Sequence, residues 1–233
     1  IITDHWKSLE LIKKENIEKV KTFCLLHSKE INHPKGSLIN KRLLKSVNSA
    51  NFVIANSNYT KELAIKIGID KSKIHIIFPG IYKPKNVDSI TKIKADELFN
   101  DAFPKIITVS RLVKRKGHDK ILMLIKNLKP KFPKIKYISI GFGEEENNLF
   151  KLTKELSLEK EVIFLKNIDQ NIKNALVQKA DLFLMPTRID KKSIEGFGIS
   201  FVESGSYGTG SIGGKDGGSS DAIVHDKTGL LCD

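Results

Sequence analysis

Short apolar runs rich in β-branched residues alternate along the chain with stretches in which apolar positions recur every three to four residues. The apolar runs are continuous rather than alternating, which is typical of strands buried on both faces of a parallel sheet. The pattern predicts helices and strands in alternation, and hence an α/β protein. The predicted strands are residues 22–26, 52–55, 74–78, 105–109, 137–140, 162–165 and 182–185, and the predicted helices are residues 59–67, 118–128, 144–156 and 169–179.

The alternation pauses between residues 81 and 104. This segment contains Pro84 and Pro104, several lysines and no clear strand, so we interpret it as a linker with a peripheral helix. The sequence thus predicts a first domain at residues 1–80 and a second domain at residues 105–233. The first domain is short for a complete α/β unit, and the chain begins with Ile1 rather than Met, so we expect a fragment of a longer protein.

Composition narrows the class of protein. The 233 residues are 40% hydrophobic, which argues against intrinsic disorder, and the apolar runs are too short to span a bilayer. Cys24 and Cys232 cannot form a disulfide framework and are expected to be free thiols in a reducing compartment. The net charge is +13, and the lysines are distributed over every segment of the chain. This distribution favours a solvated lysine-rich surface over a nucleic-acid-binding surface.

The segment at residues 193–203 carries the strongest chemical signal. It follows a predicted buried strand and reads Ser-Ile-Glu-Gly-Phe-Gly-Ile-Ser-Phe-Val-Glu. Gly196 and Gly198 permit a tight turn, and the apolar run after them predicts the start of a buried helix. Because a helix that starts just beyond a strand offers free N–H groups, this corner suits a phosphate or diphosphate. Glu195 is expected at the rim of such a site, and Glu203 about two turns into the helix.

A basic loop follows the strand at residues 105–109. Residues 110–118 hold four cations within six positions, which could neutralise a diphosphate leaving group. We assign this role to Arg111 and Lys116, and we expect Lys114 and Arg115 to belong to a solvated loop.

A third segment, Gly141-Phe142-Gly143, also follows a predicted strand but lacks the third glycine of a dinucleotide fingerprint. The three glutamates after it are expected to favour a helix N-terminus through its dipole.

Taken in chain order, these motifs resemble the retaining, nucleotide-sugar-dependent glycosyltransferases of the GT-B fold, family 4. The resemblance extends over nearly the whole chain from residue 22 onward. Four further motifs of the family have counterparts in this sequence. A histidine after a strand corresponds to His27, and an Asn-Ser pair to Asn56-Ser57. A proline-glycine hinge corresponds to residues 77–80, and a glycine-rich closing region to residues 217–221 and 228–231.

The resemblance implies a donor site between two Rossmann-like domains, the first of them incomplete. Arg111 and Lys116 would grip the donor diphosphate, and Glu195 would contact hydroxyls of the transferred sugar. Glu203 would bind the nucleotide ribose. The N–H groups of the glycine turn would cradle the phosphate, and two further loops would contact the base, so that the donor site also includes Ser110, Gly141, Leu165, Lys166, Gly196, Phe197, Gly198 and Ile199.

His27 matches the histidine that lines the acceptor side of the cleft in this family, although a lone histidine at a strand end is equally often structural. The catalytic set implied by the resemblance is His27, Arg111, Lys116 and Glu195. Two features of the family have no counterpart here: the first strands with their glycine-rich loop, and the last helices that brace the two domains. Residues 204–211 are poor helix formers, so the helix that precedes them should be short.

The implied function is transfer of a hexose-type sugar, with retention, from a nucleoside diphosphate sugar to a hydroxyl of a glycan, glycolipid or related cell-envelope acceptor. No cofactor and no metal are expected, because the proposed site has no DxD-like motif and its cations take the role of a metal. The positive charge is compatible with peripheral contact to an anionic membrane, so a cytoplasmic location, at the inner membrane surface or free, is expected. Turnover by residues 1–233 alone is expected to be weak or absent.

Two other classes of function remain open at this stage. One is a sugar-nucleotide epimerase or a phosphorylase on the same fold, because a fold does not fix chemistry. The other is a non-catalytic basic binding module, although nucleic acid is not an expected partner because aromatic residues are only 7% of the chain.

Overall fold

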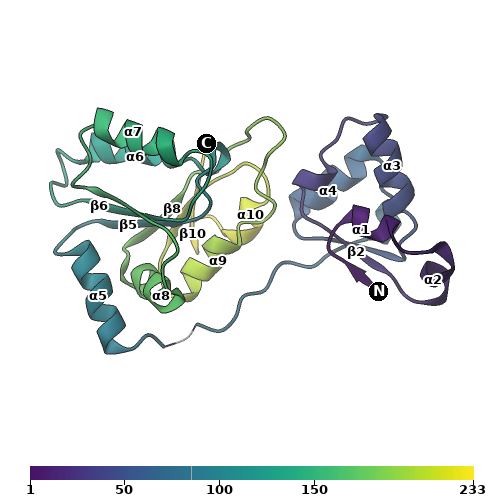
Figure 1. Ribbon diagram of the computed structural model, residues 1–233, viewed down its shortest axis with the longest axis horizontal. Helices are drawn as coiled ribbons and strands as arrows, with labels where there is room; N and C mark the ends of the chain where they lie inside the picture. The colour runs from purple at the N-terminus through teal and green to yellow at the C-terminus, as the bar shows by residue number, and fades with distance from the viewer. Residues whose placement is uncertain (85) are drawn as a thin grey trace.

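The computed structural model describes residues 1–84 and 86–233 (Figure 1). The chain forms two halves, each built on its own parallel sheet, and an extended segment after residue 76 connects them. The predicted α/β class with two parallel sheets is confirmed.

The first half has four strands in the described chain, ordered β1-β2-β3-β4 and all parallel. They are β1 (Ile2–Thr3), β2 (Phe23–Leu26), β3 (Phe52–Ala55) and β4 (Ile74–Ile76). The two-residue strand β1 was not predicted, because so short an edge strand has no periodicity to detect. Strand β4 ends two residues earlier than predicted.

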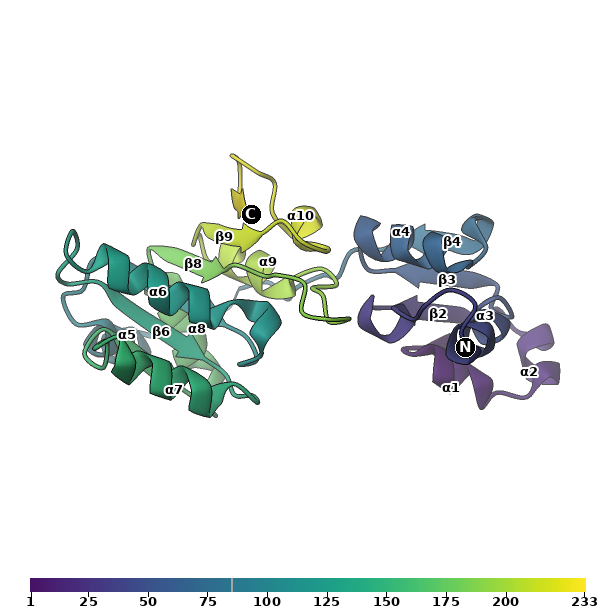
Figure 2. The same ribbon diagram turned by 90° about the horizontal axis from the view of Figure 1, so that it is seen from above.

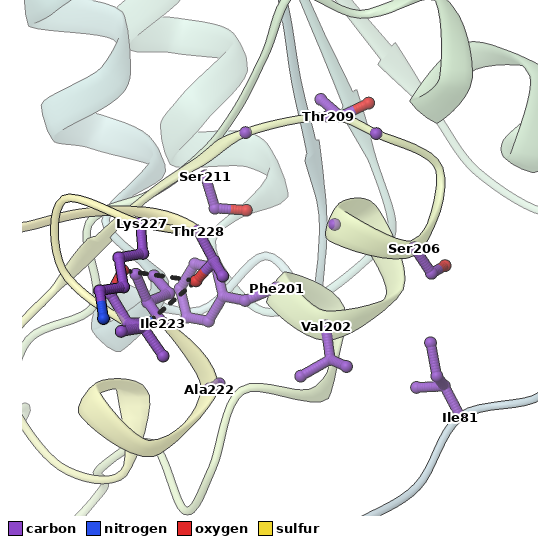
Figure 3. Close-up of a pocket in the computed structure, with 14 residues that line it drawn as sticks. Ile81, Phe201, Val202, Ser206, Thr209, Ser211, Ala222, Ile223, Lys227 and Thr228 are labelled. Atoms are coloured by element: carbon purple, nitrogen blue, oxygen red, sulfur yellow. Dashed lines mark hydrogen bonds between the residues drawn. The ribbon is translucent and has the colours of Figure 1, made fainter.

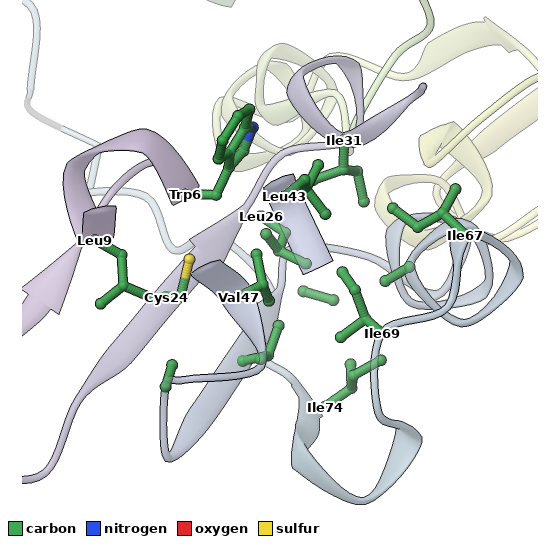
Figure 4. Close-up of a cluster of buried hydrophobic side chains, with 14 residues drawn as sticks. Trp6, Leu9, Cys24, Leu26, Ile31, Leu43, Val47, Ile67, Ile69 and Ile74 are labelled. Atoms are coloured by element: carbon green, nitrogen blue, oxygen red, sulfur yellow. The ribbon is translucent and has the colours of Figure 1, made fainter. Parts of the chain in front are cut away.

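The core of the first half lies on one face of its sheet. Helices α1 (Trp6–Glu10), α3 (Leu38–Val47) and α4 (Asn58–Ile67) contribute to this cluster, in which Trp6 is buried against apolar side chains from the strands (Figure 4). A short helix, α2 (Lys14–Lys19), lies between α1 and β2. The prediction that every strand is buried on both faces is wrong for β2 and β3, in which fully and partly buried residues alternate. Their partly buried face carries the stacked rings of Phe23 and Phe52.

The second half has six strands in the described chain, ordered β10-β9-β8-β5-β6-β7 and all parallel. They are β5 (Lys105–Val109), β6 (Lys136–Ile140), β7 (Val162–Leu165), β8 (Leu182–Met185), β9 (Ser211–Gly214) and β10 (Gly229–Cys232). Strands β5, β6 and β8 are almost continuously buried, as predicted for the centre of a doubly covered sheet.

Helices cover both faces of this sheet (Figure 1). On one face lie α6 (His118–Leu128) and α7 (Glu146–Glu155), and on the other lie α5 (Ser89–Phe99), α8 (Gln170–Lys179) and α9 (Ile199–Ser206). Each face has its own cluster of buried apolar side chains.

Helix α5 belongs to the second half, although its residues fall inside the predicted linker. Its buried residues Ala95 and Phe99 join the same apolar cluster as Leu176 and Phe183, and Lys179 of α8 forms an ion pair with Asp96 at 2.7 Å. The sequence shows a polar surface on α5 but not the partner that its apolar side packs against, so the predicted boundary at residue 104 lies within the second unit.

Local signals set the helix ends. The hydroxyl of Ser57 accepts a hydrogen bond from the Thr60 amide at the start of α4, and Gly68 ends this helix in a left-handed conformation. Asp169 caps α8 in the same way. The glycine- and serine-rich region after α9 is ordered as β9, helix α10 (Ser219–Ala222) and β10, and α9 is short, as predicted.

Within the described ranges, no helix has both the length and the apolar character that crossing a bilayer would require.

Candidate functional site

The site lies at the switch point of the second sheet. Strand β5 pairs with β6 on one side and with β8 on the other, so the loops after β5 and β8 leave the sheet side by side and open a crevice between them. Residues 110–117 form the first of these loops and residues 186–198 the second. The topology therefore brings together the two segments with the strongest chemical signals in the sequence.

Two glycines allow these loops to approach one another and to turn. Gly117, at φ +74°, lies against the second loop, where an added Cβ would overlap the carbonyl of Pro186. Gly198, at φ +91°, is the residue before α9 and lets the chain turn sharply into this helix. Gly198 and Ile199, at the start of α9, line a cavity at this crevice, and the first N–H groups of a helix have no partner within the helix.

A buried ion cluster occupies the crevice. The Glu195 carboxylate accepts a hydrogen bond from Lys116 Nζ at 2.6 Å and from Arg115 Nη1 at 2.5 Å. All three side chains are nearly buried, with exposed fractions of 9% for Lys116, 12% for Arg115 and 10% for Glu195. Both hydrogen bonds end on Oε2, so the other oxygen, Oε1, has no donor in the described part of the chain.

The charges of this cluster depend on one another. Burial raises the pKa of the Glu195 carboxyl, but the charges and hydrogen bonds of Lys116 and Arg115 outweigh burial and hold this pKa below its usual value. Burial lowers the pKa of Lys116, and the neighbouring charge of Glu195 opposes that change, while Arg115 and Arg111 add to it. Removing either cation would leave the buried carboxylate with one partner.

His118 holds the start of the basic loop. Its Nε2 lies 3.0 Å from Ser110 Oγ and 3.3 Å from the Arg111 carbonyl, and its Nδ1 lies 3.0 Å from the Tyr137 hydroxyl. The carbonyl can only accept, so Nε2 carries the hydrogen in this contact. Burial lowers the pKa of His118 to about 4, which keeps the ring neutral at pH 7. Ser110 therefore supports the loop through His118.

A cavity of about 430 Å³ opens beside the ion cluster, and both halves of the chain line it. The first half contributes His27, Lys29, Glu30 and Asn56, the connecting segment contributes Pro79, and the second half contributes Arg111, Arg115 and residues 194–199. The loop after β8 reaches the first half (Figure 2), where an added Cβ on Gly196 would lie 2.7 Å from the His27 carbonyl. The ring of Phe78, in the connecting segment, stacks on that of Phe197, with the ring centroids 5.7 Å apart.

His27 is at the mouth of this cavity, and its ring is partly exposed. Its Nε2 lies 2.8 Å from Asp4 Oδ1, and its amide donates to Glu30 Oε1 at 2.5 Å. The structure therefore brings His27 and Glu195 to one cavity, although they are far apart in the sequence and lie in different halves.

The segments expected to contact a base line a separate cavity of about 210 Å³. Gly141, Leu165 and Lys166 meet there with Leu112, and Gly141 fits against Ser110 so closely that a side chain would overlap its carbonyl. Glu146 forms an ion pair with Lys166, with 2.8 Å between Oε1 and Nζ. Its charge is therefore compensated by a lysine as well as by the helix dipole that the sequence predicted. Glu203 lines a third cavity, near Gln170 and Tyr82.

Two expectations about individual side chains are wrong. Arg115 is not a solvated loop residue, because a short 3-10 turn at Lys114–Lys116 directs it onto Glu195. Glu195 is not at the rim, because its side chain is nearly buried and its carboxylate is paired with Arg115 and Lys116. Arg111 remains exposed at the cavity, and Lys114 is exposed as expected. Three adjacent cations give no sequence signal for which of them points inward.

One further hollow, of about 500 Å³, lies alongside α9 and the loop that follows it and holds none of the predicted site residues (Figure 3). Small residues such as Gly205, Gly208 and Gly210 line it, together with Lys227 and Thr228. In the described residues, no three His, Cys, Asp or Glu side chains come together as metal ligands would.

Comparison with known proteins assigns this chain to a family. The family model described as Glycosyl transferases group 1 matches residues 89–233, and the model described as Glycosyltransferase Family 4 matches residues 3–83. The two matches meet at the extended segment between the halves.

Curated relatives include two GDP-mannose-dependent alpha-(1-6)-phosphatidylinositol monomannoside mannosyltransferases. The protein of Mycolicibacterium smegmatis is 30% identical over 132 residues, and that of Mycobacterium tuberculosis is 31% identical over 132 residues. These matches cover 56% of this chain and 35% and 34% of the relatives, so the chain spans about a third of the length of the curated relatives that it matches.

Solved structures share the fold. The Anabaena protein HepE, crystallised with UDP, superposes with a TM-score of 0.81 at 21% identity, covering 100% of this chain and 64% of that one. A glycosyltransferase from Rickettsia africae gives a TM-score of 0.75 at 21% identity, covering 92% of this chain and 56% of that one.

Proposed function

We propose, from the premise that this chain belongs to the group 1 glycosyl transferases, that it binds a nucleoside diphosphate sugar and serves the transfer of a hexose-type sugar to an acceptor hydroxyl with retention. The observation that carries this proposal is the Glu195 carboxylate, buried with two cations at the start of α9 and facing a cavity shared by both halves. A nucleoside diphosphate sugar requires a carboxylate that accepts hydrogen bonds from the sugar hydroxyls. It also requires cations that bind the diphosphate.

The cations and the helix would act on the leaving group. As the bond between the sugar and the diphosphate breaks, negative charge grows on the departing phosphate. Arg111, Lys116 and the N–H groups of Gly198 and Ile199 would stabilise that charge more in the transition state than in the ground state. Because the Lys116 side chain is nearly buried, its contact with the phosphate would be stronger than one on an open surface.

Glu195 would hold the sugar. Its Oε1 has no donor in the described residues and can accept a hydrogen bond from a sugar hydroxyl, while Oε2 is occupied by Arg115 and Lys116. The acceptor would enter from the first half, on the side of His27 and Asn56. Retention follows if the leaving phosphate takes the acceptor proton on the face from which it departs, so that no protein nucleophile is required.

The loops at Gly141 and at Leu165–Lys166 would contact the base, and Glu203 would contact the ribose. The named relatives use GDP-mannose and the named HepE structure holds UDP, so both bases are candidates for the donor of this chain. We further propose that the diphosphate charge is balanced by these protein cations without a metal ion. The net charge of +13 supports an acceptor presented at an anionic membrane surface on the cytoplasmic side.

Calorimetric titration of this chain with GDP, UDP and ADP tests the proposal. We expect one of the three to bind, and we expect Lys116→Ala to weaken that binding by about 10- to 100-fold, as for loss of one buried charged contact. Lys114→Ala is the matched control, because Lys114 is an exposed cation in the same turn and its loss should change the affinity little.

The catalytic part of the proposal is tested with a labelled donor and EDTA. Where transfer or donor hydrolysis is measurable, Lys116→Ala should lower the rate by about 10²–10³-fold, and EDTA should leave it unchanged. Absence of any nucleotide binding by the unaltered chain, or an affinity that Lys116→Ala leaves intact, would contradict the assignment.

A further inference from the structure

Arg115 and Lys116 share one oxygen of one buried carboxylate, which is an unusual use of two cations. Both N···O distances are short, at 2.5 and 2.6 Å, and both end on Glu195 Oε2. Lys116 also lies 3.4 Å from Met185 Sδ and is buried, whereas Arg115 lines the cavity. In this arrangement the Lys116 ammonium contacts Glu195 and Met185 and is not among the residues that line the cavity, so it has to shift away from Glu195 to meet a diphosphate there.

We propose that Arg115 is a positioning residue that keeps Glu195 in place and ionised when Lys116 transfers its hydrogen bond from Glu195 to the donor diphosphate. The proposal rests on the proposed function for its ligand. A diphosphate carries more negative charge than one carboxylate and competes for the Lys116 ammonium. Arg115 would then be the remaining partner of Oε2, so that the buried carboxylate is never left without a cation.

The geometry gives Arg115 the fixed position that this role requires. Its carbonyl accepts a hydrogen bond from the Arg188 amide at 2.9 Å, which ties the turn to the loop after β8. Arg188 is itself held by Asp119 through two hydrogen bonds of 2.9 and 3.0 Å. The Arg115 backbone is thus anchored from the same loop that carries Glu195, and its nearly buried guanidinium lies directly against the carboxylate.

The first test is a double-mutant cycle on nucleoside diphosphate affinity, measured by calorimetry with GDP or UDP. If Arg115 acts through Glu195, Arg115→Gln should weaken binding about tenfold, because the carboxylate then retains Lys116. In the Glu195→Gln background the same substitution should have almost no effect. An equal loss in both backgrounds would mean that Arg115 contacts the diphosphate itself and would overturn the proposal.

The second test follows the Glu195 carboxyl directly and needs no ligand. In chains labelled with ¹³C-glutamate, the Glu195 signal is identified by its absence in Glu195→Gln and is followed against pH by NMR. Arg115→Gln should raise the pKa of this carboxyl, since burial then acts against a single cation, whereas Arg115→Lys should restore most of the wild-type curve. Lys114→Gln, with the same change of charge in an exposed position, should leave the curve unchanged.

Other charged groups face this carboxylate and could move the curve in every variant alike: Lys116 and Arg111 from the basic loop, and His27, Lys29 and Glu30 from the first half. The comparison of Arg115→Gln with Lys114→Gln removes their common contribution. Identical curves for these two variants would overturn the proposal even if nucleotide binds. Failure of the unaltered chain to bind any nucleotide would instead count against the proposed function and would leave the NMR result to decide on Arg115.

Discussion

His118 shows how much one buried side chain can determine around this site. It begins helix α6, it is buried, and its two ring nitrogens contact groups from the basic loop and from β6. A charged imidazolium would have no compensating carboxylate at hydrogen-bonding distance there, so burial holds its pKa down, to about 4. The neutral ring joins the loop that carries Arg111 to the centre of the sheet.

This environment predicts acid sensitivity of the second half. The unfolded chain takes up a proton on His118 near pH 6.5, whereas the folded chain does so only near pH 4. The contribution of neutral His118 to the free energy of unfolding is therefore fully present above pH 6.5 and is lost as the pH falls towards 4. The loss should approach about 3 kcal/mol. Urea unfolding followed by circular dichroism at pH 7 and pH 4.5 measures it, and His118→Gln should remove most of this pH dependence.

The control for this prediction is His225→Gln, because His225 is exposed in the same half and should behave like the unaltered chain. Trp6, the single tryptophan, reports on the first half by fluorescence, and its transition should not respond to His118→Gln. An equally acid-sensitive His118→Gln chain would show that another group is responsible.

Helix α9 carries the proposed phosphate end of the site, and its sequence has a low intrinsic tendency to form a helix. It runs for eight residues and ends in a serine- and glycine-rich region with low helix propensity. Its N-terminal end is nevertheless fixed, because Phe201 is buried in the core beneath the sheet and Gly198 permits the entry turn. Packing therefore sets the position of the helix, and propensity sets its length.

Two glycines at the end of α9 should respond in opposite directions to the same substitution. Gly205 lies inside the helix with nothing within 4 Å of an added Cβ, so Gly205→Ala should stabilise the second half by about 0.5–1 kcal/mol. Gly208 has equal space but lies at φ +86°, so Gly208→Ala should destabilise it by about 1–2 kcal/mol. Urea unfolding of both variants checks this, and equal effects would contradict it.

The two halves meet through a small number of polar and aromatic contacts around the shared cavity. Asp221 of α10 accepts hydrogen bonds at 2.6 Å from both the amide and the side chain of Asn58, at the start of α4. Asn32 donates to the Lys192 carbonyl at 3.2 Å, and Phe78 stacks on Phe197. Because the cavity is lined from both sides, we expect these contacts to determine whether the proposed acceptor side and the proposed donor side face one another.

We expect Asp221→Ala to separate the halves without unfolding either one. The loss of two hydrogen bonds to an exposed carboxylate should weaken the contact by about 1–2 kcal/mol. The measurement is small-angle X-ray scattering, in which the radius of gyration should increase. Glu159→Ala, with the same change of charge at an exposed position distant from the contact, should not change it. Equal scattering curves for the two variants would exclude Asp221 as a determinant of the arrangement.

Much of this architecture was readable from the sequence. Strands and helices followed from hydrophobic periodicity and from caps such as Ser57 and Asp169, because these signals act within a few residues. The motifs after β5 and β8 could be placed at strand ends, and the rule that a switch point opens a crevice brought them together. For that reason Lys116 and Glu195 were expected in one site, and the structure places them in contact.

The remaining features depended on contacts between distant segments. Arg115 reaches Glu195 across 80 positions of sequence, and the direction of its side chain depends on a 3-10 turn that no periodicity reveals. The burial of Glu195 and the docking of α5 on the second core were likewise invisible, because a local pattern shows that a side chain is apolar or charged but not which surface will cover it. Local propensity fixed the elements, and packing between them fixed which charges meet.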